Sequence, residues 1–337
     1  MRAVIKLIFL RMQRIKIFIG LCICFSFVVN AKAQKEHFLI ISDPGKGPTE
    51  YSIKTQSRYA PFPDSARSNG HDYNGQHFSF KDHYNDSSVD LFIPKNIKYK
   101  KTLELVVWFH GWSNNIDSAD GFYGLTEQFR DANRNAIIIF PEGPKNAPDS
   151  YGGKLERPEM FALFINDLLK QLEANTIIPK NKHYSIKDCS ITLAGHSGAY
   201  RVISKIIQYN KIDELLLFDA MYGGNDAYLH WIAESKRHRF IQIYTKDGGT
   251  FENTHLIMNQ LKDSLKVDIL SVNENELQMD HLLSTKPLFI FSENEHNEVI
   301  TWNENLYRFL HRWKKEEQWH ETKIITEEIR KLMKWNN

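Results

Sequence analysis

Apolar runs with few polar residues inside them alternate along this chain with segments whose apolar residues recur at helical spacing. The runs 103–111 (LELVVWFHG) and 136–144 (AIIIFPEGP) are of the first kind. A strand buried on both faces has a continuous apolar sequence rather than an alternation of apolar and polar residues. Strands that alternate with helices at this spacing predict βαβ units, and therefore a mostly parallel sheet covered by helices on both faces.

Punctuation by Pro, Gly and polar clusters divides the chain into expected elements. Strands are expected within 85–96, 103–111, 136–144, 190–195, 214–220 and 239–245, with a last strand in 266–272 or in 287–291. Helices are expected over 119–134, 158–175, 198–209, 226–236, 252–265 and 297–315. A charged amphipathic tail over 319–334 is expected to pack against the domain. Because no linker-like or repeated segment interrupts the series, residues 34–337 are expected to form one domain.

The first 33 residues have a composition of their own. They contain six Lys or Arg and no acidic residue, and the basic start leads into the apolar run 17–29. Ala31 and Ala33 then stand at the −3 and −1 positions of a cleavage site, which predicts a secretory signal peptide that is removed after Ala33. The apolar run is shorter than the roughly 20 residues that a transmembrane helix needs, so an uncleaved anchor is the less favoured alternative. The mature protein is expected to be secreted or periplasmic, without a stable membrane span.

Charge and cysteine content exclude several classes of function. The chain has 43 Lys and Arg against 41 Asp and Glu, but the leader accounts for six of the basic residues. The mature chain is therefore slightly acidic, and its composition gives no support for nucleic-acid binding. Two of the three cysteines also lie in the leader, which leaves Cys189 with no partner for a disulfide or a cysteine metal site. Neither an H-E-x-x-H motif nor a Gly-rich phosphate loop is present, so no metal and no cofactor is expected.

Polar residues that can carry chemistry follow the predicted strands. His110-Gly111-Trp112 follow one strand, Ser197 follows another between glycines, and Asp219, Asp247 and His296 follow later ones. Active sites of parallel α/β sheets lie at the carboxyl ends of the strands. A serine becomes a nucleophile when a base removes its proton, and the base is in turn oriented by a third group. The order Ser, Asp, His therefore predicts a nucleophile, an acid and a base at one edge of the sheet.

The segment 195-GHSGA-199 resembles the G-x-S-x-G elbow of the α/β-hydrolase superfamily, and especially its secreted lipase and esterase branches. The resemblance covers roughly residues 100–315 and departs from the motif at Ala199, where a small residue still meets the packing requirement. It implies that Ser197 is the nucleophile, and that His296, in 296-HNEV-299, is the base, with His281 as competitor. It also implies that the backbone amides of Gly198 and Trp112 form the oxyanion hole.

The third member of the triad has two candidates. Asp247, in 244-YTKDGGT-250, stands where most of the superfamily carries its acid, but Asp-Gly-Gly is also a common turn sequence. Asp219 ends an apolar strand in 217-LFDA-220, which resembles the setting of the acid in some lipases. A carboxylate at the end of a buried strand needs a partner such as a histidine N–H. This favours Asp219 slightly and leaves Asp247 as the alternative.

The polar loop 142–160 is expected to contact the substrate. It carries Lys145, Asp149, Lys154 and Glu156, which suit a polar or charged substrate, although long loops are also polar simply because they are solvated. The sequence thus predicts a secreted, monomeric serine hydrolase that cleaves an ester of a polar compound, such as a carbohydrate ester, through an acyl-enzyme. A peptidase or amidase acting on cell-wall or other peptides, and a non-catalytic binding protein of the same fold, are the alternatives.

Overall fold

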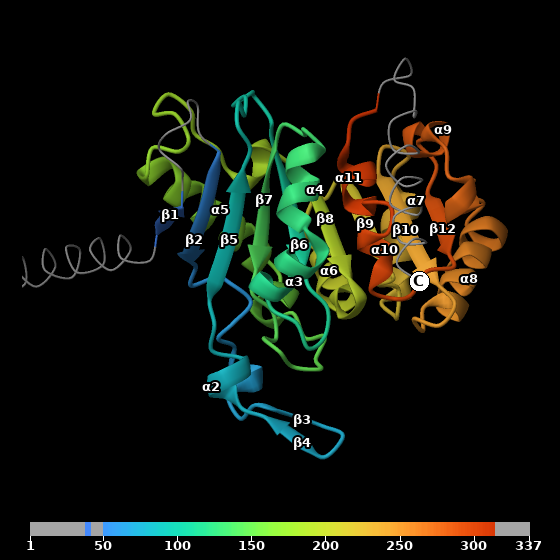
Figure 1. Ribbon diagram of the computed structural model, residues 1–337, viewed down its shortest axis with the longest axis horizontal. Helices are drawn as coiled ribbons and strands as arrows, with labels where there is room; N and C mark the ends of the chain where they lie inside the picture. Colours follow the sequence, from blue (N-terminus) through green and yellow to red (C-terminus); the bar gives the residue numbers. More distant parts are fainter. Residues whose placement is uncertain (1–37, 42–49, 314–337) are drawn as a thin grey trace, which may run out of the picture.

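A computed structural model describes residues 38–41 and 50–313 (Figure 1). The predicted signal peptide and its cleavage site after Ala33 lie outside the described residues, as does the predicted tail helix 319–334. Both remain predictions. Within the described part of the chain, no helix is both long and apolar enough to cross a membrane.

A ten-stranded sheet forms the centre of the molecule (Figure 1). Its strand order is β1-β2-β5-β7-β6-β8-β9-β10-β12-β11. The strands are β1 (Leu39–Ile41), β2 (Tyr51–Gln56), β5 (Ser88–Ile93), β6 (Leu103–Phe109), β7 (Ala136–Pro141), β8 (Cys189–His196), β9 (Glu214–Phe218), β10 (Arg239–Thr245), β11 (Leu270–Asn273) and β12 (Leu288–Ser292).

The sheet is parallel from β7 to β11 and antiparallel at its other end. Strands β1, β2, β5 and β7 pair antiparallel with one another in that order, and every other pairing is parallel. The prediction of a mostly parallel sheet is confirmed. The two alternative positions of the last strand are both occupied, by β11 and β12, which pair with each other.

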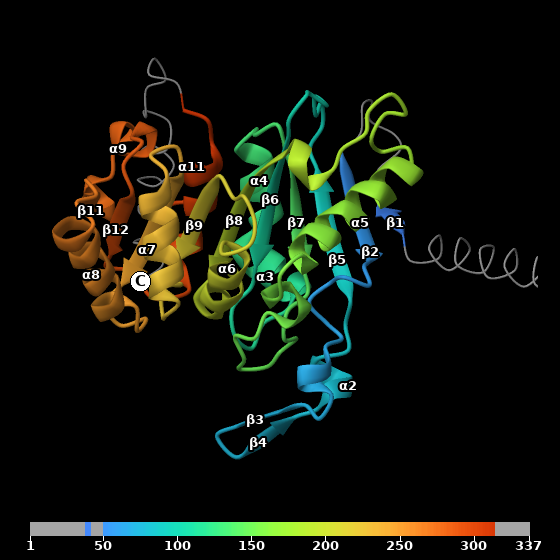
Figure 2. The same ribbon diagram turned by 180° about the vertical axis from the view of Figure 1, so that it is seen from behind.

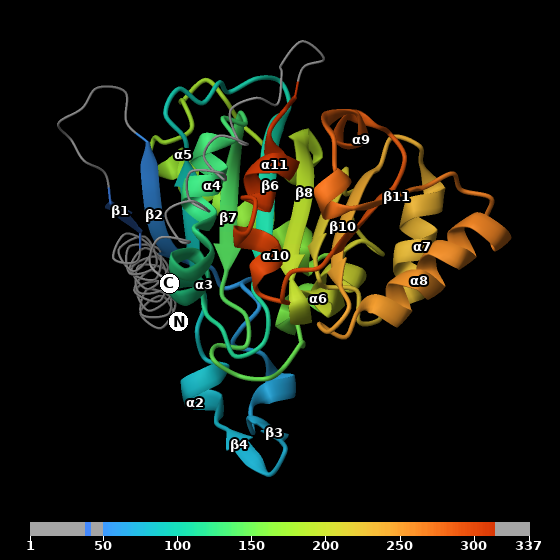
Figure 3. The ribbon, with the colours of Figure 1, turned by 45° about the vertical axis from the view of Figure 1, so that its right-hand side comes forward.

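Helices cover both faces of this sheet, as predicted (Figures 2 and 3). One face packs against α5 (Met160–Ala174), α6 (Tyr200–Ile206), α7 (Asn225–Glu234) and α8 (Phe251–Asn259). The other packs against α3 (Ile116–Tyr123), α4 (Leu125–Asp131), α9 (Met279–Leu283), α10 (Glu298–Thr301) and α11 (Asn305–Leu310). Strand β6 serves both cores, because Val107 faces the first and Val106 faces the second. This double burial is why its sequence has no polar alternation.

Three predicted helices are interrupted. The segment 119–134 forms α3 and α4, separated by Gly124 in the left-handed conformation (φ 60°), a geometry that favours glycine. The segment 297–315 forms α10 and α11, with Glu304 in the left-handed conformation between them. The segment 252–265 changes after Asn259 into a π-helical turn, Gln260–Ser264. Local backbone geometry of this kind leaves no mark in the apolar periodicity.

Residues 57–87, between β2 and β5, form an arm that extends away from the sheet and includes the short helix α2 (Phe80–His83) (Figure 1). The arm ends in a hairpin of β3 (His71–Tyr73) and β4 (Gln76–Phe78), which was not expected from the sequence. Asn74 (φ 48°) and Gly75 (φ 77°) make its two-residue turn. Asn-Gly is the preferred sequence for such a turn, because both residues need positive φ. The pattern that could have predicted the hairpin was therefore present.

Candidate active site

The strand register brings the predicted site residues to one edge of the sheet. Phe109 pairs with Gly195, and His196 pairs with Phe218. Phe218 pairs in turn with Ile243. Strands β6, β8 and β9 therefore end side by side, and the residues that follow them, including Ser197 and Asp219, emerge at the same edge.

Ser197 occupies a strained turn between β8 and α6. Its φ is +54°, which a residue with a side chain rarely adopts and which costs of order 1–3 kcal/mol. The turn is tight because a Cβ at Gly195 would lie 2.6 Å from Cβ of Ala199 and 2.9 Å from Cδ1 of Ile203. Gly195 is therefore required, whereas an alanine at position 199 fits as long as Gly195 faces it. This accounts for the departure from the G-x-S-x-G pattern.

Trp112 and Gly198 lie against each other beside Ser197. A Cβ at Gly198 would lie 2.3 Å from Cδ1 of Trp112, and a Cβ at Gly111 would lie 2.8 Å from Cβ of Ser197. Both glycines are thus needed for the close approach of the 110–113 loop to the elbow. Gly198 is the second residue of the helical turn Ser197–Ala199, where a backbone N–H has no partner within the helix. The hydrogen bonds that fix the loop include one from Trp112 Nε1 to Ser150 Oγ (2.5 Å) and one from the Ser113 N–H to the Ala147 carbonyl (2.9 Å).

The structure pairs His296 with Asp219. His296 Nδ1 lies 2.6 Å from Oδ2 of Asp219, whose side chain is fully buried. The hydroxyls of Thr245 (2.7 Å) and Thr250 also donate to this carboxylate, and so does the backbone N–H of Thr245 (3.2 Å). Burial by itself would raise the pKa of Asp219, but the hydrogen bonds from His296, Thr250 and Thr245 outweigh it and lower the pKa. The carboxylate is therefore ionised and available to hold the imidazole.

The other two candidates lie elsewhere. Asp247 is exposed in the turn after β10. Gly248, which follows Asp247, packs directly against the Asp219 carboxylate, because a Cβ at this position would clash with it. The Asp-Gly-Gly sequence is therefore a turn that covers Asp219. His281 lies in the short helix α9, where its Nδ1 accepts from the backbone N–H of Gln278.

His196 supports the loop that carries His296. Burial lowers the pKa of His196 to about 3, with His296 as a further cause, so its ring is neutral. Its Nε2 lies 3.0 Å from the His296 carbonyl, which can only accept, so Nε2 carries the proton. Its Nδ1 lies 3.3 Å from the hydroxyl of Tyr123, which also lies 2.9 Å from the Asn297 side chain. A buried neutral histidine therefore fixes the backbone of the second histidine.

Tyr222 is a further residue of the site, outside the predicted triad and oxyanion hole. Its hydroxyl donates to the Gly248 carbonyl. Its ring is nearly perpendicular to that of His296, with centroids 6.3 Å apart. Burial raises the pKa of Tyr222, and the Asp219 carboxylate raises it further, so the phenol remains protonated. Its position three residues after Asp219 was visible in the sequence, but only as one aromatic residue among many.

Ser197 and His296 line one cavity of about 470 Å³. Its other walls come from the 111–114 loop, from Phe122 and Tyr123 at the end of α3, and from His196 and Asn297. Within the described ranges, no group of three or more His, Cys, Asp or Glu side chains could hold a metal ion.

The four residues of the 142–160 loop that were predicted to contact the substrate are not among the lining residues of that cavity. Lys145 pairs with Asp86 (2.6 Å), and Asp149 accepts from Arg67 Nε (2.7 Å). Lys154 Nζ donates to the Arg58 carbonyl (2.7 Å), and Glu156 pairs with Arg201 (2.8 Å). Three of these partners belong to the 57–87 arm. Three of the four charges therefore hold the arm, whereas the role of all four in substrate binding stays a prediction.

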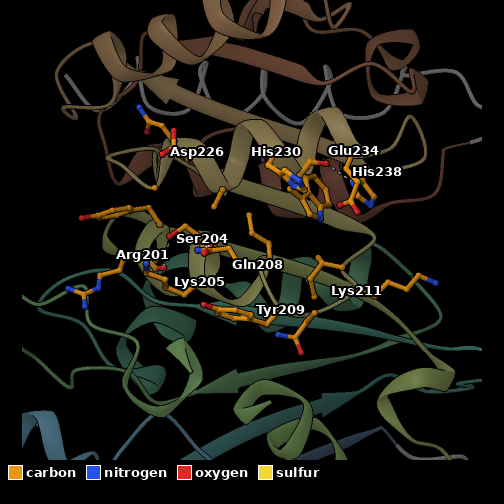
Figure 4. Close-up of a pocket in the computed structure, with 18 residues that line it drawn as sticks. Arg201, Ser204, Lys205, Gln208, Tyr209, Lys211, Asp226, His230, Glu234 and His238 are labelled. Atoms are coloured by element: carbon orange, nitrogen blue, oxygen red, sulfur yellow. Dashed lines mark hydrogen bonds between the residues drawn. The ribbon is translucent and has the colours of Figure 1, made fainter. Parts of the chain in front are cut away.

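A larger cavity, of about 1190 Å³, lies between α6 and α7 on one face of the sheet (Figure 4). Arg201, Lys205 and Gln208 line one side of it, while His230 and Glu234 line the other. Ser197, His296 and Asp219 are not among its lining residues. Cavity volume therefore does not identify the candidate active site, which is identified instead by the chemistry of the residues that line the smaller cavity.

The fold and site together define an α/β protein with a serine in a strained strand-to-helix turn, and with a buried aspartate that holds a partly exposed histidine, at the carboxyl edge of its sheet. No protein-family model matches the chain, and neither does any curated protein. The solved structures that it resembles are α/β-hydrolase esterases and related serine hydrolases at low identity.

Three of these structures illustrate the likeness. The feruloyl esterase module from Clostridium thermocellum is 14% identical, with 69% of this chain and 86% of that chain covered and a TM-score of 0.43. Fluorophosphonate-binding serine hydrolase F of Staphylococcus aureus is 13% identical, with 77% and 96% covered and a TM-score of 0.43. An S-formylglutathione hydrolase from Agrobacterium tumefaciens is 8% identical, with 80% and 99% covered and a TM-score of 0.41. At these identities the likeness concerns the fold alone.

Proposed function

We propose that the protein is a serine hydrolase that cleaves a carboxylic ester through an acyl-enzyme. The observation that carries the proposal is the arrangement of Ser197 and His296. Ser197 stands in a left-handed turn, and His296, held at Nδ1 by the buried Asp219 carboxylate, lines the same cavity. A structural serine would not need the strained backbone or an oriented, partly exposed imidazole beside it.

Each residue has a defined task in this reaction. Because Nδ1 of His296 donates to Asp219, its Nε2 is unprotonated and can accept the proton of Ser197 Oγ as the oxygen attacks the acyl carbon. The carbonyl oxygen gains negative charge, which the backbone N–H groups of Gly198 and Trp112 stabilise; one such donor contributes about 3 kcal/mol. The imidazolium then gives its proton to the leaving alcohol. A water molecule, deprotonated by His296, hydrolyses the acyl-enzyme and regenerates Ser197.

An ester is preferred over an amide as the scissile bond because an alcohol leaves more readily than an amine. Among the described residues, those that line the cavity include Asn114, Ser118 and Asn297 but no carboxylate that could bind an amino terminus. A polar ester agrees with this lining. The leader sequence supports action outside the cytoplasm, in the periplasm or beyond the cell.

Hydrolysis of a panel of short esters, compared with aminoacyl anilides, tests the proposal. The mature chain from Gln34 is expected to release acid from the esters, and Ser197→Ala is expected to abolish the release. Turnover of anilides without turnover of esters would instead establish an amidase. Equal ester turnover by the wild type and Ser197→Ala would show that the nucleophile lies elsewhere.

A further inference from the structure

Large aromatic side chains gather around Ser197. Of the ten large apolar side chains that are exposed in the described part of the chain, four lie around this site. Phe122 (67% exposed) and Trp112 (43% exposed) line the cavity that contains Ser197. Tyr222 lies next to His296, with ring centroids 6.3 Å apart, and Tyr73 contacts Trp112. Isolated exposed apolar residues are ordinary, but a group around one cavity is typical of a binding site.

Tyr73 lies in the hairpin of the 57–87 arm, far along the sequence from Trp112, Phe122 and Tyr222. Its ring centroid lies 5.2 Å from that of Trp112, at an interplanar angle of 76°. Two rings at nearly a right angle form a corner, and each remains more than one-third exposed. Trp112 cannot move away freely, because its Nε1 donates to Ser150 and its ring lies against Gly198.

The arm that carries Tyr73 is held firmly at its base. Phe62, Phe78 and Tyr84 of the arm are buried in a small cluster of their own with Ala147 of the 142–160 loop. Asp64 of the arm, whose side chain is fully buried, pairs with Arg157 at the end of that loop. This packing holds the base of the arm in place. The hairpin beyond it is best explained by the contact between Tyr73, next to the hairpin turn, and Trp112.

The ion pairs between arm and loop have the same consequence. Arg67 Nε lies 2.7 Å from Asp149, whose side chain is 5% exposed, and Lys145 pairs with Asp86 where the arm returns to β5. Removing one partner of the largely buried Arg67–Asp149 pair would leave an uncompensated charge, so the pair restricts where the arm can lie. The loop charges thus position the hairpin, and through it the ring of Tyr73, next to the catalytic edge.

We propose that Tyr73 and Trp112 form a wall that binds a six-membered ring of the substrate, aromatic or pyranose, next to the scissile ester. This inference rests on the proposed function. An aromatic ring and the apolar face of a pyranose both pack on exposed aromatic side chains, and this is the chemistry they share. Tyr73 is a specificity-determining residue in this account: it contributes to binding of the ring and takes no part in the proton transfers.

Three esters test the proposal: ethyl butyrate, which has no ring, methyl 3-phenylpropanoate, which has an aromatic ring, and an acetylated methyl glucoside, which has a pyranose. Tyr73→Ala is expected to raise KM about tenfold for one or both ring-containing esters, with kcat nearly unchanged. It is expected to leave ethyl butyrate within twofold of wild type, and Tyr73→Phe is expected to behave as wild type on all three. Whichever ring ester responds identifies the source of the ring.

Tyr209→Ala is the matched control, because Tyr209 is also an exposed tyrosine (53%) and lies in the cavity between α6 and α7. It is expected to change nothing. The inference fails if Tyr73→Ala alters all three esters equally, or none of them, while the wild type remains active. If the wild type hydrolyses no ester at all, the proposed function fails, and this inference fails with it.

Discussion

Replacing Asp219 by Asn would test the acid of the triad, and the structure predicts which way the new amide turns. Oδ1 of Asp219 accepts from the backbone N–H of Thr245, which cannot reverse its role. Oδ2 faces His296 Nδ1 at 2.6 Å. In the Asp219→Asn variant the amide oxygen would therefore keep the Thr245 contact, and the amide NH₂ group would face the imidazole. Nδ1 must then accept, which places the proton on Nε2.

An imidazole protonated at Nε2 cannot take the proton of Ser197. The same change in a Ser-His-Asp triad lowers kcat about 10⁴-fold through the wrong tautomer, which corresponds to about 5.4 kcal/mol of transition-state stabilisation. We expect a loss of that size for Asp219→Asn. The matched control is Asp247→Asn, which should stay within about threefold of wild type because Asp247 is exposed in a turn.

The assay is kcat on a short ester, with thermal unfolding of each variant measured alongside. An Asp219→Asn variant that is folded and retains a tenth of wild-type kcat would refute the reasoning. So would a large loss in Asp247→Asn.

Three further changes give measurable outcomes. In the folded protein the pKa of His196 is lowered to about 3, whereas in the unfolded chain it is about 6.5. Below about pH 6.5 the unfolded chain therefore binds a proton that the folded protein does not bind, and the free energy of unfolding falls by up to about 1.4 kcal/mol per pH unit. His196→Gln should therefore lose less stability than wild type between about pH 7 and pH 5, by urea unfolding, and an identical pH dependence would contradict this. Gly198→Ala should displace Trp112 and lower kcat about 10²–10³-fold with little change in melting temperature. A variant as active as the wild type would show that the oxyanion loop is placed differently. Glu214→Gln should destabilise the fold by about 3–5 kcal/mol, because the Glu214 carboxylate lies 2.7 Å from the buried Arg134, and unchanged denaturant unfolding would disprove it.

The sequence was sufficient for the part of the fold that depends on burial. Strands β6 and β7 are buried on both faces, so their runs of apolar residues could be recognised without any other information. Helix α5 was predicted for a similar reason, since Phe161, Phe164 and Leu168 recur at helical spacing and are all buried. Strands β1 and β2 were missed because partly exposed residues dominate them and the segment between them is polar.

The site was less accessible from sequence because its geometry depends on contacts between distant segments. The position of Ser197 could be predicted from its own neighbours, since the tight turn is a local property. The choice between Asp219 and Asp247 could not, because it depends on a fold that brings His296 to β9 and places Gly248 over the carboxylate. The charges of the 142–160 loop were interpreted as substrate contacts because three of their four partners, in the 57–87 arm, lie 59 to 96 residues away along the chain.

The most direct test of the central claim is covalent labelling by a fluorophosphonate, which reacts with a serine only when a base activates it. The native protein should be labelled once, on the peptide that contains Ser197, and mass spectrometry of the digest would locate the site. Ser197→Ala should not be labelled, and labelling of Asp219→Asn should be slowed by orders of magnitude. A native protein that stays unlabelled, or a label on any other residue, would contradict the account.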